Sequence, residues 1–397
     1  MVRDPGLIRR SFGLQKEIEP TLQSQYHSEL IEAIKRNEYH IVFGEYEVFL
    51  AREFGFCYGV DRAVNLAYET RRQFPNRRII ITHEIIHNPR VNQNLKDMGV
   101  EFMTGAAPDD SRWDAVGAND VVLLPAFGAS AELTERLKAT GATIVDTTCG
   151  SVMNVWRRVQ TYQREGYTAI IHGKHSHEET IATKSRAGKY IVVLDMRQVD
   201  MLCDYIEGRG GREAFLREFE ERCSPGFDPD ADLKKVGIAN QTTMLSSESL
   251  AIAGRVQQSI EHRYGSAEGH FRRFDTICSA TQDRQDAMQE MLKRDLDLML
   301  VVGGFNSSNT AHLLEIALQS CPAYHIYDAT CIESLTRIQH SPLNSKQAAH
   351  TEDWFPSGAR KIGFTAGAST PNSITGNCIK RTLELLGVTP IESAHLR

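Results

Sequence analysis

Three cysteines stand in the same local context, between a strand-like run and a helical run. They are Cys57 in EFGFCYGVDRAVNL, Cys149 in IVDTTCGSVMNVWRRV and Cys278 in FDTICSATQDRQDAM. A thiolate at a helix N-terminus is stabilised by the helix dipole and by free N–H groups. Three such thiols could converge on one metal centre. Cysteine is also a common core residue, and Cys331 in YDATCIES follows a strand in the same way, so spacing alone leaves these alternatives open.

A second cluster is THEIIHN, which holds His83, Glu84, His87 and Asn88. It looks like the H-E-x-x-H motif of zinc hydrolases, in which both histidines share one helical face. Here the motif follows a strand, and Pro89 limits any helix at the second histidine. This argues against a metalloprotease. A histidine at a strand end can bind an anion, or it can be an ordinary buried histidine.

The segment HGKHSHEETIAT is dense in histidine and glutamate: His172, His175, His177, Glu178 and Glu179. It follows a strand-like run, and ligands of open α/β sheets bind beyond the carboxyl ends of strands. Histidine next to glutamate offers a cation for phosphate and an acid for proton delivery. The alternative is a solvated loop followed by an acidic helix start.

Small polar residues follow three further strand-like runs, in NQTTMLSS (240–247), GGFNSSNT (303–310) and TAGASTPN (365–372). Ser, Thr, Asn and Gly at strand–helix junctions form anion sites through backbone N–H groups. One such cluster would be an ordinary helix cap. Three of them indicate a phosphorylated ligand. The chain has neither G-x-x-x-x-G-K-[ST] nor G-x-G-x-x-G, so nucleotide binding is not favoured.

The elements that must position these residues alternate between strand and helix. Short β-branched runs predict strands within 78–84, 120–127, 142–148, 168–174, 190–195, 235–241, 298–304, 324–330 and 361–367. Helical stretches lie between them, for example at 59–73 and 309–319, and this alternation indicates βαβ units. The charged, Gly- and Pro-bearing segments 207–235 and 339–358 are interpreted as loops or insertions.

Composition excludes several classes of protein. The 397 residues are 41% hydrophobic and 24% charged with net charge −6, which is typical of a globular protein and gives no sign of nucleic-acid binding. The chain has no run of 18 apolar residues, so no membrane span is predicted. The N-terminus has no signal-peptide pattern. Eight cysteines in so long a chain do not form a disulfide framework, and a cytoplasmic protein is expected.

With these residues in view, the sequence resembles the 4-hydroxy-3-methylbut-2-enyl diphosphate reductases, the IspH/LytB family, and is most similar to their cyanobacterial and plastid branch. The matching motifs are GFCYGVDRA, HEIIHN, DTTC, HEETIAT, QTT, ICSATQDRQ, VVGGFNSSN and TAGAST, in the family's order over residues 53–372. The resemblance implies three parallel-rich α/β modules in pseudo-threefold arrangement around a central iron–sulfur cluster. The expected segments are an N-terminal arm (1–50) and modules at 51–148, 149–277 and 278–397.

The resemblance also implies roles for individual residues. Cys57, Cys149 and Cys278 would ligate a 4Fe–4S cluster that has one open iron, and Cys331 falls outside the matched frame. Glu179 would supply the proton, assisted by Thr242 and His177. The expected substrate-binding residues are His87, His177, Gln241, Ser307, Ser308, Asn309 and Ser369. Glu178 is expected to point to solvent or to pair with a lysine or arginine.

The implied reaction is reductive removal of an allylic hydroxyl, which gives isopentenyl and dimethylallyl diphosphate as the last step of the methylerythritol phosphate route. A ferredoxin or flavodoxin would donate electrons. No nucleic acid or membrane partner is expected, and a homodimer is left open. The location would be the cytoplasm, or the plastid stroma in a plastid-bearing organism. One departure is Phe127, where many bacterial members have a histidine. The competing interpretation is a binding module for phosphorylated metabolites with inert cysteines.

Overall fold

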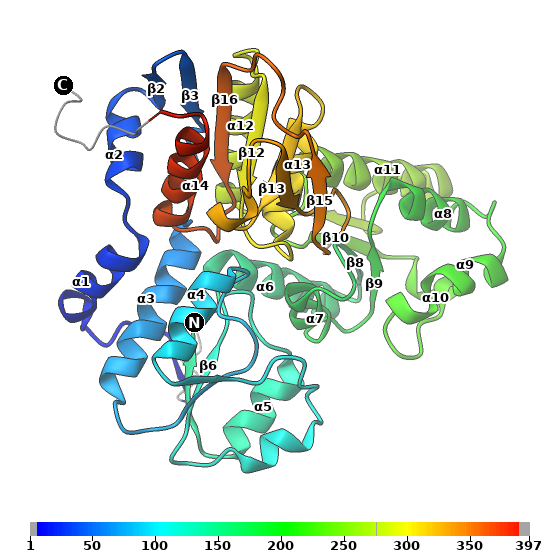
Figure 1. The fold of residues 1–397 in the computed structure, drawn as a ribbon. Helices are drawn as coiled ribbons and strands as arrows, with labels where there is room; N and C mark the ends of the chain where they lie inside the picture. The colour runs from blue at the N-terminus through cyan, green and yellow to red at the C-terminus, as the bar shows by residue number, and fades with distance from the viewer. Residues whose placement is uncertain (1–5, 275, 346, 389–397) are drawn as a thin grey trace. The chain divides into compact units, whose positions relative to one another are not determined.

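The computed structural model describes residues 6–274, 276–345 and 347–388. The chain divides into two compact units (Figure 1). Unit 1 comprises Met1–Arg9, Arg77–His83 and Phe102–Cys278, and unit 2 comprises Arg10–Asn76, Glu84–Glu101 and Ser279–Arg397. The site residues are therefore described unit by unit.

Unit 1 holds two parallel sheets. In the first, β1 (Leu7–Ile8), β7 (Thr143–Asp146), β6 (Val121–Leu124) and β4 (Ile79–Ile81) lie in that order. In the second, the order is β11 (Phe271–Arg273), β10 (Val236–Asn240), β8 (Thr168–His172) and β9 (Tyr190–Val193). Strands β6, β8 and β10 are buried throughout, which explains their uninterrupted apolar runs.

The helices of unit 1 connect these strands. They are α5 (Ala131–Ala139), α6 (Gly150–Glu165), α7 (Glu178–Lys184), α8 (Met196–Ile206), α9 (Arg212–Phe219), α10 (Pro229–Asp232) and α11 (Ser246–Tyr264), with the 3-10 turns η1 (Ser111–Ala115) and η2 (Glu220–Arg222). The segment 207–235, interpreted above as a loop or insertion, contains α9, η2 and α10. Its helix α9 buries Phe215 and Phe219 in the core formed with α8 and α11.

Unit 2 is built on one sheet in the order β13 (Ala323–Ile326), β12 (Leu298–Val302), β16 (Lys361–Ala366), β3 (Tyr46–Leu50) and β2 (His40–Phe43). All neighbours are parallel except β2 and β3, which form an antiparallel edge. A separate antiparallel pair joins β14 (Arg337–His340) to β15 (Ala349–Glu352), so the segment 339–358, interpreted above as a loop or insertion, contains strand structure. Strand β5 (Val100–Phe102) lies where the chain passes between the units.

The helices of unit 2 are α1 (Gln15–Tyr26), α2 (Glu29–Arg36), α3 (Tyr58–Gln73), α4 (Pro89–Asp97), α12 (Ser279–Leu292), α13 (Ser308–Ala317) and α14 (Asn372–Leu385), with the 3-10 turn η3 (Ala329–Cys331). Helix α14, red in Figure 1, packs against β16 and α2. The core of this unit includes Ile31, Val48, Leu300 and Phe364.

All nine predicted strand regions contain a strand, and the predicted α/β class with three parallel-rich sheets is confirmed. The division into an arm and three modules stays a prediction. Residues 1–50 nevertheless contribute structure to both units. Strand β1 pairs with β7 in unit 1, whereas β3 pairs with β16 in unit 2, more than 300 residues along the chain.

Candidate active site

A buried polar contact in unit 1 joins Glu179 to Thr242. Glu179 lies in the first turn of α7, and Thr242 follows β10. The backbone N–H of Thr242 donates to Glu179 Oε1 at 2.7 Å, and its hydroxyl donates to Oε2 at 2.9 Å. Both side chains are buried. A buried carboxylate with a donor at each oxygen is held in one orientation, as an acid–base group must be.

Thr242 also connects this carboxylate to a predicted cluster ligand. Its carbonyl oxygen accepts a hydrogen bond from the backbone N–H of Cys278 at 3.3 Å. One residue therefore holds Glu179 through its N–H and hydroxyl and Cys278 through its C=O. The sequence placed these three residues in three different motifs, and the structure brings them together.

Gln241 has a structural role that the sequence did not indicate. Its side-chain oxygen accepts from the backbone N–H of Lys174 at 3.0 Å, and its amide nitrogen donates to Thr243 Oγ1 at 2.8 Å. A Cβ on Gly173 would stand only 2.9 Å from the Gln241 Cβ, so glycine is required for this close approach. Gln241 thus fixes the loop that leads into α7 relative to Thr242. Contact of Gln241 with a substrate stays a prediction.

His177 caps the helix that carries Glu179. Its Nδ1 accepts a hydrogen bond from the backbone N–H of Glu179 at 3.2 Å. Because Nδ1 acts as an acceptor, the proton of the neutral ring is on Nε2. His177 is thereby a hydrogen-bond donor at its outer nitrogen, a suitable partner for a phosphate oxygen.

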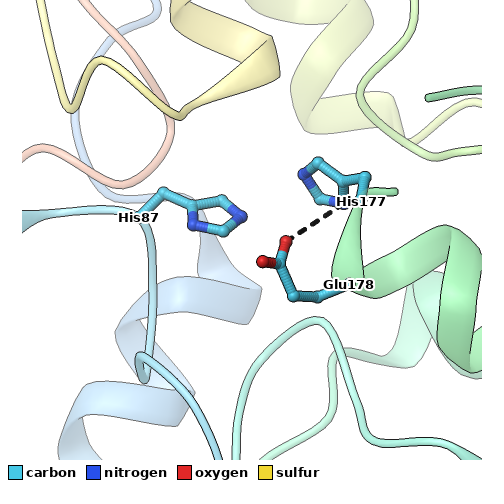
Figure 2. A group of neighbouring side chains, drawn as sticks. All are labelled: His87, His177 and Glu178. Carbon is cyan, nitrogen blue, oxygen red and sulfur yellow. Dashed lines mark ion pairs between the residues drawn. The ribbon is translucent and has the colours of Figure 1, made fainter. Parts of the chain in front are cut away.

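Glu178 differs from the expectation that it points to solvent or pairs with a lysine or arginine. Its Oε1 lies 3.2 Å from His83 Nε2, and its Oε2 lies 3.8 Å from His177 Nδ1, which Figure 2 marks with a dashed line. The side chain is 28% exposed. The two consecutive glutamates do face different ways, because Glu179 contacts Thr242 and Glu178 contacts histidines.

Phe127 packs edge-on against two of these imidazoles. Its ring centroid lies 5.7 Å from that of His83 and 6.4 Å from that of His177, with interplanar angles of 77° and 74°. The ring is buried, at 7% exposed. A phenyl ring at this position offers apolar contact and no hydrogen bond. Phe127 therefore contributes no hydrogen-bond donor for a phosphate at this position.

The other histidines of HGKHSHEETIAT have structural partners. His172 is fully buried, and its Nδ1 lies 2.9 Å from Ser249 Oγ. His175 Nε2 lies 2.9 Å from Lys184 Nζ. Burial and the Lys184 charge lower the pKa of His175, which favours the neutral ring. The neutral ring can accept a hydrogen bond from the Lys184 ammonium group. For these two residues the interpretation as ordinary structural histidines is the better one.

In unit 2, His87 belongs to a polar triangle with Glu84 and Asn306. His87 Nδ1 lies 3.1 Å from Glu84 Oε2, and Asn306 Nδ2 donates to the same oxygen at 2.9 Å. The carboxylate fixes the ring orientation, as second partners of functional histidines commonly do. His87, also drawn in Figure 2, is predicted to bind substrate. Asn306 could not be singled out from the sequence, although it lies within the motif GGFNSSNT.

The predicted anion residues of unit 2 lie on two adjoining loops. Ser307 caps α13, where its hydroxyl accepts from Thr310 N, and Ser308 and Asn309 form the first turn. Ser369 Oγ donates to the His87 carbonyl at 3.1 Å. A Cβ on Gly304 would stand 2.4 Å from that same carbonyl oxygen, so the close approach of the loops requires glycine.

Asn309 has a buried side-chain hydrogen-bond donor that could bind a ligand. Its Oδ1 accepts from the backbone N–H of Ala368 at 3.0 Å, whereas its buried Nδ2 has no hydrogen-bond partner within the described part of the chain. A buried donor without a partner costs about 1–3 kcal/mol, which a ligand oxygen would recover. The carbonyl of Ala368 in turn accepts from the Cys57 N–H at 3.1 Å. In this unit too, the backbone of one residue, Ala368, connects a predicted cluster ligand, Cys57, to a predicted substrate contact, Asn309.

The three predicted cluster cysteines occupy equivalent positions. Cys57 and Cys149 are the N-caps of α3 and α6, and Cys278 directly precedes α12. All three are partly exposed. Within unit 1, the Ser151 hydroxyl donates to Cys278 Sγ at 3.4 Å, and Ser151 lies in the first turn of the helix that Cys149 caps. The two predicted cluster cysteines of unit 1, Cys149 and Cys278, therefore both lie at the N-terminus of α6.

The other five cysteines differ chemically. Burial raises the pKa of Cys203, Cys321 and Cys331 to about 11 and that of Cys223 to about 12, and it raises the pKa of Cys378 as well. A metal ligand must be a thiolate, which this burial disfavours. The alternative of Cys331 as a ligand, which spacing left open, is therefore the weaker one.

A known protein family matches most of this chain. The family model described as LytB protein matches residues 48–383. The chain belongs to the LytB family. It is 47% identical over 388 residues to 4-hydroxy-3-methylbut-2-enyl diphosphate reductase of Acaryochloris marina, covering 95% of this chain and 93% of the relative. The enzyme of that name from Gloeobacter violaceus is 48% identical over 395 residues, with coverage of 98% and 94%.

Two solved structures are similar to this LytB chain. One is (E)-4-hydroxy-3-methyl-but-2-enyl diphosphate reductase, described as the terminal enzyme of the non-mevalonate pathway. It has a TM-score of 0.52 and 28% identity over 85% of this chain and 99% of its own. The reductase from Plasmodium falciparum has a TM-score of 0.62 and 24% identity, covers 86% and 88%, and supports the fold alone. Within the described residues, every helix is too short or too polar to cross a membrane.

Proposed function

We propose that this LytB protein catalyses the two-electron reduction of (E)-4-hydroxy-3-methylbut-2-enyl diphosphate to isopentenyl and dimethylallyl diphosphate. The observation that carries the proposal is the arrangement around Thr242, which holds the Glu179 carboxylate at 2.7 and 2.9 Å and the Cys278 backbone at 3.3 Å. A proton donor next to a redox ligand is what removal of a hydroxyl group requires. The names of the close relatives support the same reaction.

We propose that Cys57, Cys149 and Cys278 hold a 4Fe–4S cluster. Their positions at helix starts and their partial exposure fit thiolate ligands, and the raised pKa values of the five other thiols do not. Three protein ligands leave one iron open. When bound, such a cluster supplies electrons singly and polarises an oxygen at the open iron.

The acid–base work falls to Glu179 and Thr242. The reaction breaks one C–O bond and forms one C–H bond, and it consumes two electrons and two protons as the hydroxyl leaves as water. Protonated Glu179 can give its proton to the Thr242 hydroxyl, which accepts and donates at the same oxygen. This pair thereby forms a short proton path that needs no bulk water.

Each unit offers donors of its own for a phosphate group. In unit 2, the Asn309 Nδ2 and the start of α13 offer donors for an anion. Ser307, Ser369 and His87 already hydrogen-bond within the loops, so we assign them the shaping of this donor set as well as contact with phosphate. In unit 1, His177 donates through Nε2.

The test is anaerobic reconstitution with iron and sulfide, followed by turnover with the hydroxymethylbutenyl diphosphate. The expected result is a brown protein with about four irons per chain that releases both products when a chemical reductant is supplied. A colourless protein that takes up no iron yet binds the diphosphate would support the metabolite-binding module instead. That outcome would overturn the proposed reaction.

A further inference from the structure

An exposed group of cations in unit 1 takes no part in the proposed chemistry. Arg158 lies on α6, Lys235 immediately precedes β10 and Arg272 lies on β11, and all three are exposed. They share one support of three aromatic rings, because Phe274, Tyr162 and Tyr167 form a continuous row. The ring centroids are 6.1 Å apart from Phe274 to Tyr162 and 6.4 Å apart from Tyr162 to Tyr167.

Each cation contacts a ring of this row. The Arg158 guanidinium lies 4.0 Å from the Phe274 centroid, and Arg272 and Lys235 lie 5.5 and 5.7 Å from that of Tyr167. Such contacts hold flexible side chains in place without neutralising them. We call Arg158, Lys235 and Arg272 the basic cluster.

The local sheet geometry explains why these residues share a face. Gly237 pairs with Arg272 across β10 and β11, so both residues project from the same side of the sheet. A Cβ on Gly237 would stand 2.5 Å from the Tyr162 ring, which shows that α6 lies flat on this side. Arg272 therefore meets the ring row through Tyr167, at the edge of the sheet.

The side chains of the basic cluster keep most of their positive charge. Arg272 is 3.5 Å from Glu165, with both side chains about half exposed, and such a pair is weak. Arg158 and Lys235 have no carboxylate partner among the residues that the structure describes. This is a basic face on a chain whose net charge is −6. An acidic partner would be drawn to this face and repelled by much of the remaining surface.

Two members of the basic cluster are also close along the chain to the predicted ligands Cys149 and Cys278: Arg158 lies on α6, which Cys149 caps, and Arg272 lies on β11, which precedes Cys278. Arg158 is nine residues from Cys149 along the same helix, which is about 14 Å at 1.5 Å per residue. Phe274 is four residues before Cys278, at most about 14 Å of chain. The basic cluster therefore lies on the surface a short way from both sulfur atoms.

We propose that the basic cluster is the docking surface for a small acidic ferredoxin that reduces this enzyme. The inference rests on the proposed function, because that reaction needs two electrons from outside the chain. Two reduced ferredoxins each give one electron and leave oxidised. The electrons and two protons convert the C–O bond into a C–H bond and water. Cations held on aromatic rings suit a transient encounter, which needs steering and fast release.

The test compares the holoenzyme with an Arg158→Gln/Lys235→Gln/Arg272→Gln variant. Turnover is measured with two electron donors in separate titrations. One is a reduced acidic [2Fe–2S] ferredoxin, and the other is a reduced viologen, which needs no docking surface. Binding of oxidised ferredoxin is measured by calorimetry at low salt and at about 0.5 M salt, where surface charges are screened. A matched control is Lys234→Gln/Arg217→Gln, because both residues are exposed, and Lys234 lines a separate cavity with Tyr205 and Arg263.

We expect the triple variant of the basic cluster to bind ferredoxin more weakly and to raise the ferredoxin KM by about tenfold or more. Its affinity for ferredoxin should also depend less steeply on salt concentration than that of the wild type. Viologen-driven turnover should stay at the wild-type level, and the control variant should match wild type throughout. Unchanged ferredoxin affinity, an equal loss in the control, or an equal loss with viologen would each overturn the proposal. So would a loss of affinity for flavodoxin without one for ferredoxin. A wild-type holoenzyme that is inactive with viologen would instead contradict the proposed function, and the calorimetric comparison would still decide whether this surface binds ferredoxin.

Discussion

Replacing Glu179 by Gln removes an acidic proton and little else. The glutamine oxygen can still accept the Thr242 N–H now at 2.7 Å, and its amide can donate to the Thr242 hydroxyl now at 2.9 Å once that hydroxyl rotates. Positioned proton transfer contributes roughly 10²–10⁴ in rate, which corresponds to about 3–5 kcal/mol of activation free energy. We therefore expect Glu179→Gln to keep its iron content and substrate affinity and to lose at least about 99% of turnover.

Two neighbouring substitutions calibrate this loss. Glu178→Gln makes the same charge change one residue away, where the carboxylate forms a 3.2 Å pair with His83 and both side chains are at least a quarter exposed. Such pairs contribute about 0.2–1 kcal/mol, so the loss should stay below about fivefold. Thr242→Val removes the hydroxyl donor to Glu179 but keeps the backbone donor. A hydrogen bond to a charged group contributes about 1.5–3 kcal/mol, so an intermediate loss of about 10- to 150-fold is expected.

The assay is single-turnover product formation under anaerobic conditions, with each variant matched to wild type in iron content and visible absorption. The reasoning requires the order Glu178→Gln, Thr242→Val, Glu179→Gln from mildest to most severe. More than a tenth of wild-type turnover in Glu179→Gln would refute its role as the proton source. A Glu178→Gln variant as inactive as Glu179→Gln would refute the assignment of different roles to the two glutamates.

Three further predictions concern other parts of the chain. Cys149→Ser and Cys278→Ser should each lose most of the iron, whereas Cys331→Ala should retain it, as measured by iron analysis and visible absorption; retention in Cys149→Ser with loss in Cys331→Ala would reverse the assignment. Asn309→Ala should weaken binding of the diphosphate about tenfold or more, because it removes the buried Nδ2 donor, and unchanged affinity in calorimetry would show that this donor does not meet the ligand. Burial lowers the pKa of His325 to about 4, so the native state binds fewer protons than the unfolded state between about pH 4 and 6.5. The free energy of unfolding should therefore fall as pH drops through that window, by up to about 3 kcal/mol from this residue; denaturant titrations should show a flatter profile for His325→Gln, and an identical profile would contradict the sign.

The sequence predicted the sheets well where strands are buried on both sides. Runs such as LMLVV in β12 have no polar face, and their strand character can be seen without a partner. It failed for β2 and β3. Their placement depends on pairing β3 with β16, and nothing local to residues 40–50 specifies a partner more than 300 residues away.

The same distinction applies to the candidate site. Ser307 and Asn309 could be singled out because a cap at a strand–helix junction is a local pattern. The pair between His83 and Glu178 could not, since it joins residues 95 positions apart and depends on how two strands are packed. The bracing role of Gln241 was missed for the same reason, because its partner Lys174 belongs to another loop. Local patterns within one motif were sufficient to single out candidate site residues. The contacts that each residue makes depend on tertiary structure, which those patterns do not specify.

Phe127, His177 and Glu178 form one connected group in unit 1. Phe127 contacts the rings of His83 and His177 edge-on and contributes no charge, whereas Glu178 lies 3.2 Å from the His83 ring and 3.8 Å from the His177 ring. At His177, the bond from the Glu179 N–H at 3.2 Å occupies Nδ1, whereas Glu178 is 3.8 Å away, beyond hydrogen-bond distance. The shorter contact sets the tautomer. The hydrogen bond that starts α7, and so positions Glu179, is therefore also the one that makes His177 a donor through Nε2.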